Sequence, residues 1–105
     1  MQAIDDLNRL LAILPSRLEK LPNPGSKPSP DKWSPKQELG HLLDSAVNNL
    51  RRIVLIQLED KPALCNYDGE RWVEVQQYET RSWPEIIELW RALNLELWAR
   101  RYLQA

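Results

Sequence analysis

Apolar residues recur at spacings of three and four along three stretches of the chain, which is the pattern of amphipathic helices. The first stretch covers residues 4–21 and carries Ile4, Leu7, Leu10, Leu11, Leu14, Leu18 and Leu21. Pro15 falls inside it. Because proline removes a backbone donor and crowds the preceding turn, we expect a kink or a break near Leu14.

The second stretch has a clear start at Ser34, which is placed to cap a helix. Pro35 suits the first turn, and Gln37 stands where it completes a capping box with Ser34. The apolar stripe then continues to about Glu59 and consists of Leu39, Leu43, Ala46, Val47, Leu50, Ile53, Val54 and Gln57. We predict one long helix here.

The third stretch opens in the same way, with Ser82 as the cap, Pro84 in the first turn and Glu85 closing the box. Its principal face carries Ile86, Leu89, Trp90, Leu93 and Leu97; Trp83, Ile87 and Trp98 widen that face, and Leu95 and Tyr102 lie on the far side. A helix that is apolar over so wide an arc usually packs against more than one partner.

Two irregular segments separate these stretches. Five of the eight prolines fall in residues 22–35, which predicts an extended connection. Residues 60–82 are mixed: we expect a short helical turn around residues 71–75, with Tyr67 and Trp72 pinning the segment to the helices. Since no strand-like alternation competes with the helical periods, we predict one all-α domain over residues 1–105, with three helices.

The composition of the chain excludes some classes of binding partner and favours one cellular compartment. Fourteen Lys and Arg residues stand against fifteen Asp and Glu residues, so the net charge of −1 gives no broad attraction to nucleic acid or to an anionic membrane. Cys65 is the only cysteine and cannot form an intrachain disulfide, which fits a reducing compartment. The acidic N-terminus does not resemble a signal peptide, and no apolar run reaches the roughly 18 residues of a membrane span. We therefore expect a cytoplasmic protein.

His41, the only histidine, is the candidate metal ligand. On a helix it shares a side with Asp44 and Asn48, so Asp44 is a candidate auxiliary partner of the metal. A catalytic transition-metal site usually needs about three protein ligands and an open position. The alternative, which stays open, is a half-exposed histidine that binds no metal. Glu38 and His41 also match one Glu-x-x-His element of di-iron bundles, of which a symmetric dimer would supply the second copy.

Three segments resemble the DinB/YfiT-like superfamily of four-helix bundles. The segment Trp33–Ser45 (WSPKQELGHLLDS) is similar to the start of the second helix in that family. Tyr67–Trp72 (YDGERW) and Trp83–Trp90 (WPEIIELW) match a later loop and the start of the third helix, in the same order. The resemblance extends over essentially the whole chain. It implies an up-down helical bundle.

Members of this superfamily typically bind a divalent metal such as nickel or zinc through three histidines. One histidine comes from the second helix and two come from the fourth. In this sequence only His41 matches a ligand, because the pair has no counterpart before Ala105. The resemblance thus implies three helices per chain and a homodimer that completes the bundle; alternatively, the chain is a fragment of a longer protein.

Two classes of function follow. The first is a metal-dependent transferase or hydrolase that acts on a small molecule, or a degenerate or truncated relative of one. The second is a non-catalytic helical module that works by dimerisation or interaction. Since His41 is the one family ligand present, we expect the isolated chain not to be an enzyme. The residues do not identify a substrate.

Overall fold

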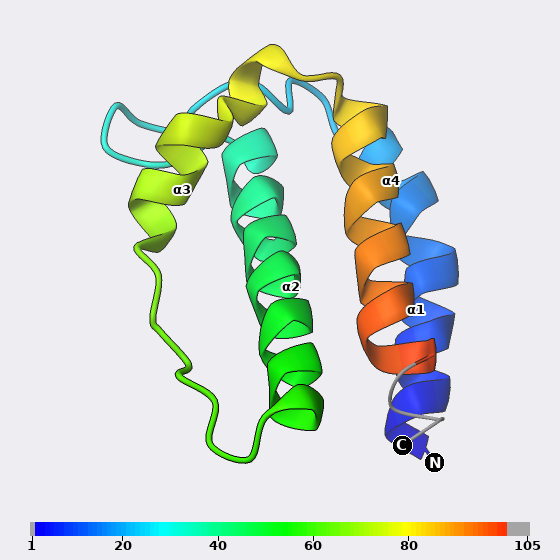
Figure 1. The fold of residues 1–105 in the computed structure, drawn as a ribbon. Coiled ribbons are helices and arrows are strands. Elements are labelled where there is room, and N and C mark those ends of the chain that lie inside the picture. Colours follow the sequence, from blue (N-terminus) through cyan, green and yellow to red (C-terminus); the bar gives the residue numbers. More distant parts are fainter. Residues whose placement is uncertain (1, 101–105) are drawn as a thin grey trace.

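Helices make up all the regular structure in the computed structural model, which describes residues 2–100 and, within them, all side chains except those of residues 4, 99 and 100 (Figure 1). The elements are α1 (Gln2–Glu19), α2 (Pro35–Leu58), α3 (Gly69–Gln76), the 3₁₀-helix η1 (Tyr78–Thr80), α4 (Trp83–Asn94) and the π-helix η2 (Leu95–Arg100). The contacts place α4 against both α1 and α2, while α3 and η1 pack on α2. No strand occurs in this range, so the all-α prediction is confirmed.

The predicted starts of α2 and α4 are confirmed by their caps. Ser34 Oγ accepts a hydrogen bond from the Gln37 amide at 3.3 Å, and Gln37 Oε1 accepts one from the Ser34 amide at 3.0 Å. At α4, Ser82 Oγ accepts from the Glu85 amide at 3.3 Å. These bonds satisfy amides that the first turn of a helix leaves without partners.

The number of helices differs from the prediction, which gave three helices per chain and a bundle completed by dimerisation. The described residues contain four α-helices, because α3 forms inside the segment expected to hold only a helical turn. Asp68 caps α3 by accepting from the Arg71 amide at 3.2 Å, and Val73 on the inner side of α3 is buried. Eight residues are too few for the apolar period to identify such a helix. A missing helix is therefore no reason to expect a dimer.

We predicted a kink or a break near Leu14, and the structure shows no break, because helix α1 continues through Pro15. Packing explains its continuity. Leu11 is buried, and the Trp83 indole of α4 donates a hydrogen bond to the Leu18 carbonyl at 2.6 Å. Tertiary contacts on both sides of Pro15 thus hold a helix that proline alone would disfavour.

The core lies where α2, α3 and α4 meet. Its buried members are Leu39, Leu43, Val73, Tyr78, Trp83, Ile86 and Ile87. The molecule is less compact elsewhere: its radius of gyration is 15.2 Å, against about 13 Å for a compact chain of this length. None of the helices in residues 2–100 is long and apolar enough to cross a membrane.

Gly40 of α2 lies directly against Tyr78, so a substitution at this position tests how closely the core is packed. A Cβ atom added at Gly40 would overlap the ring of Tyr78, whereas one added at Gly25 would meet only Lys36 Cδ, at 4.0 Å. We predict that Gly40→Ala lowers the free energy of unfolding by about 3 kcal/mol, and that Gly25→Ala changes it little. Urea denaturation measures both; equal effects of the two substitutions would contradict the packing described.

Candidate functional site

His41 lies where α2 meets the beginning of α3. Its ring centroid is 5.2 Å from that of Trp33, with the two planes tilted by 44°. On another side is Gly69, where an added Cβ would come within 2.8 Å of His41 Cε1. Nδ1 of His41 is buried and has no hydrogen-bond partner among the described residues. The imidazole is therefore enclosed by an indole and by the first turn of α3.

Asp44, one turn further along α2, is fully buried. Its Oδ1 accepts hydrogen bonds from the Tyr78 hydroxyl and from Gln76 Nε2, the latter at 3.1 Å. Its Oδ2 is buried and has no partner within residues 2–100. The carboxylate thus connects α2 to both α3 and η1. Asn48, predicted on the same side, donates to the Asp44 backbone carbonyl at 2.9 Å.

Arg81 extends these contacts beyond Asp44. One of its guanidinium nitrogens donates to Gln76 Oε1 at 2.9 Å, and its Cζ lies 4.9 Å from the centroid of the Tyr78 ring. Burial, and next the hydrogen bond to Asp44, raise the pKa of Tyr78 well above its ordinary value. Tyr78 is therefore a protonated donor at neutral pH.

Tyr67 fastens the segment that precedes α3, as its position in the sequence predicted. Its hydroxyl is 2.6 Å from Ser45 Oγ of α2, and its ring meets that of Trp72 edge-on, with centroids 5.5 Å apart. Arg52 Cζ lies 5.9 Å from the Tyr67 ring centroid. The contacts of Tyr67 with Ser45 and Arg52 confirm that Tyr67 pins the loop to α2, while Trp72 packs on Tyr67.

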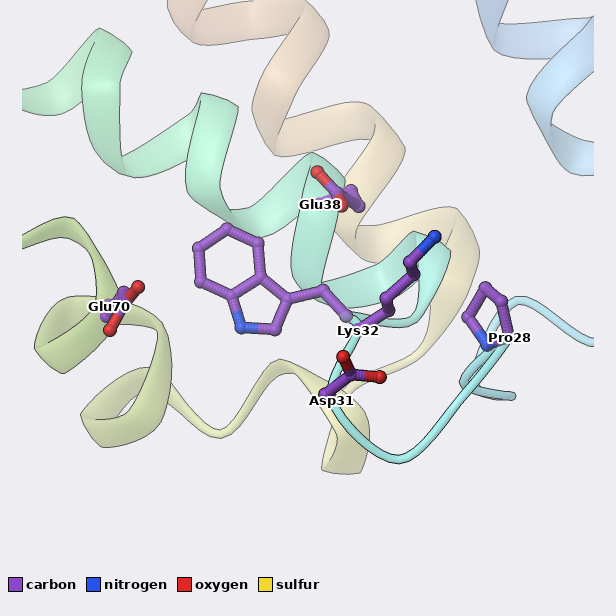
Figure 2. Close-up of a pocket in the computed structure, with 6 residues that line it drawn as sticks. Pro28, Asp31, Lys32, Glu38 and Glu70 are labelled. Carbon is purple, nitrogen blue, oxygen red and sulfur yellow. The ribbon is translucent and has the colours of Figure 1, made fainter.

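A cavity of about 370 Å³ opens near Trp33, between the proline-rich connection and the start of α3 (Figure 2). Its lining consists of Pro28, Asp31, Lys32, Trp33, Glu38 and Glu70. Figure 2 shows Glu38 extending from α2 and Glu70 from α3, while Asp31 comes from the connection. A hydrogen bond from Ser29 lowers the pKa of Asp31. These three carboxylates are all exposed, so water solvates them.

The residues around His41 do not provide the three ligands of the metal centre that the resemblance implies. Among the described residues, no three His, Cys, Asp or Glu side chains come together in a group that could hold a metal ion. Two buried atoms have no hydrogen-bond partner among the described residues, His41 Nδ1 and Asp44 Oδ2. Together they provide at most two metal-ligand atoms. A role for His41 and Asp44 in metal binding stays a prediction, and we derive no chemical step through a metal.

The sequence reasoning missed Gln76 and Tyr78, the partners of Asp44. A local signal was present in Gly40, because a glycine inside a helix costs about 1 kcal/mol relative to alanine and usually has a packing reason. That reason is the Tyr78 ring. Nothing local to Gln76 identifies it, since its contact with Asp44 spans 32 residues.

The two long helices α1 and α2, packed with α4 and a short α3, define an all-α protein of the helical-bundle class. The sequence model of the DinB superfamily matches residues 4–102. The chain therefore belongs to the DinB superfamily, as the resemblance of its three segments indicated. No curated protein and no solved structure matches the chain significantly.

The raised pKa of Tyr78 predicts a loss of stability in alkali. The unfolded chain releases the tyrosine proton near pH 10, but the folded protein retains it, so this contribution is complete below about pH 10 and falls as the pH rises further. We expect the free energy of unfolding to decline as the pH rises above about 10, and the decline to be smaller in Tyr78→Phe.

Tyr67→Phe is the matched control for this experiment, because Tyr67 has a hydroxyl partner but is only half-buried. It should keep the alkaline decline of the wild type. Urea unfolding at a series of pH values measures the slopes. Identical slopes in the wild type and in Tyr78→Phe would contradict the assignment.

Proposed function

We propose that this DinB superfamily protein works as a non-catalytic helical module that associates with a second copy of itself. The observation that carries the proposal is a second stripe on α2, formed by Leu42, Asn49 and Ile56, whose two apolar members stay about half exposed among the residues that the structure describes. Leu42 and Ile56 are 52% and 55% exposed, although both are large apolar residues on a long helix. Exposed apolar surface of this kind is typical of association sites when it is contiguous.

The spacing of the stripe supports a helical partner. Leu42, Asn49 and Ile56 follow one another at intervals of seven residues, so they share one side of α2. Seven-residue repeats are the pattern by which paired helices pack, and a polar residue such as Asn49 at the middle of the stripe favours one register.

Two further observations favour a second copy as that partner. On α1, Leu10 and Ile13 are 50% and 41% exposed, which provides a further apolar surface for another chain. The net charge of −1 produces little repulsion between identical chains. A dimer with two-fold symmetry uses the same surface on both subunits, and the stripe on α2 is suited to that arrangement.

A second candidate is the metal-dependent transferase or hydrolase activity that the resemblance implies. It is favoured by the two buried donor atoms without partners, His41 Nδ1 and Asp44 Oδ2. It requires at least one more ligand than these two atoms provide. Self-association needs no such addition, and we rank it first for that reason.

Sedimentation velocity tests the self-association. We expect the wild type to sediment as a dimer at micromolar concentration, and Leu42→Glu to raise the dissociation constant about 100-fold, because a buried unpaired carboxylate costs several kcal/mol. Val75→Glu is the control: Val75 lies on α3 and is 74% exposed, so this variant should remain dimeric. A wild type that is folded and monomeric throughout the concentration range would refute the proposal.

Elemental analysis of the purified protein distinguishes self-association from the metal-dependent activity. If the protein works by association alone, nickel and zinc should be well below one equivalent per chain, both in the wild type and in His41→Ala. About one equivalent in the wild type that disappears in His41→Ala would instead support the metal-dependent candidate. Circular dichroism of the variant confirms that any loss is not caused by unfolding.

A further inference from the structure

We propose that His41, which the resemblance would place at a metal, and Asp44, its predicted auxiliary partner, instead hold α3 and η1 against α2 without one. We call the set Asp44, Gln76, Tyr78 and Arg81, with the contact between His41 and Gly69, the α3 clasp. The inference concerns this end of the molecule and does not depend on whether the chain associates with a second copy.

The hydrogen bonds at Asp44 are the first support. Its Oδ1 already accepts from Tyr78 and from Gln76, and these two donors come from elements that follow α2 in the chain. A buried carboxylate costs much free energy unless polar groups compensate it. Here the compensation comes from the Tyr78 hydroxyl of η1 and the Gln76 amide of α3. Removal of the carboxylate would leave the buried hydroxyl and the half-buried amide without this acceptor.

The charge of Arg81 is the second support. Gln76 lies between Asp44 and Arg81: its Nε2 donates to the carboxylate at 3.1 Å, and its Oε1 accepts from the guanidinium at 2.9 Å. The guanidinium also lies 4.9 Å from the centroid of the Tyr78 ring. Arg81 is thus connected to the buried carboxylate through Gln76 and is in direct contact with the Tyr78 ring.

The contact between His41 and α3 is the third support. A Cβ added at Gly69 would lie 2.8 Å from His41 Cε1 and 3.2 Å from Nδ1, so the backbone of the first turn of α3 lies against the imidazole. His41 therefore contacts α3 directly, and the glycine at position 69 allows this close approach.

Hydrogen exchange of the α3 amides in the whole protein tests this inference. The wild type is compared with and without EDTA, and then with added nickel or zinc. Protection of α3 should be the same with EDTA as without it, and neither metal should increase it. Asp44→Ala, which removes the acceptor oxygens, should lower the protection of α3 at least about tenfold, whereas Asp31→Ala, which removes an exposed carboxylate, should leave it unchanged.

Loss of α3 protection in EDTA that nickel or zinc restores would overturn the inference, as would full protection in Asp44→Ala. If Asp44→Ala does not fold, Gln76→Ala takes its place, because it removes one donor from the clasp and leaves the carboxylate bonded to Tyr78. Unchanged α3 protection in Gln76→Ala would then be the contradicting result. The oligomeric state of each sample, measured separately, keeps a failure of this inference distinct from a failure of self-association.

Discussion

The hydrogen bonds that the buried Asp44 carboxylate accepts connect α2 to the two short helices that follow it. Removing one partner of a buried hydrogen bond leaves the other unsatisfied, at a cost of about 1–3 kcal/mol, and more for a charged group. Both donors, Gln76 and Tyr78, depend on this one carboxylate. Tyr78 is also a core residue, so its position affects the packing of α2 with α4.

The same arrangement gives the molecule a closed end and exposed apolar residues elsewhere. At the closed end, α3 and η1 pack against the side of α2 that carries His41 and Asp44, while Leu42 of the same stretch stays exposed. Further along, Ile56 of α2 stays largely exposed, as does Leu10 of α1. The closed end is where the superfamily resemblance would put a metal, and the exposed apolar residues are where we propose a second copy. Family membership is established by the match over residues 4–102, while the function is proposed from these surfaces.

The sequence predicted those parts of the fold that local chemistry determines. The Ser34 capping box and the Ser82 cap marked the starts of α2 and α4, since a cap needs only residues three positions apart. Helix α3 was missed because eight residues hold too little apolar periodicity. The partner of Asp44 could not be predicted, because Tyr78 lies 34 residues away and the contact depends on how η1 packs. His41 was identified as noteworthy, but its enclosure by Trp33 and Gly69 required the tertiary structure.

A double-mutant cycle between Asp44 and Tyr78 tests the central claim most directly. The free energies of unfolding of the wild type, Asp44→Ala, Tyr78→Phe and the double variant are measured by urea denaturation at neutral pH. If the carboxylate holds η1 through the Tyr78 hydroxyl, the two substitutions should show a coupling energy of at least about 1 kcal/mol. Effects that add to within about 0.3 kcal/mol would contradict the account.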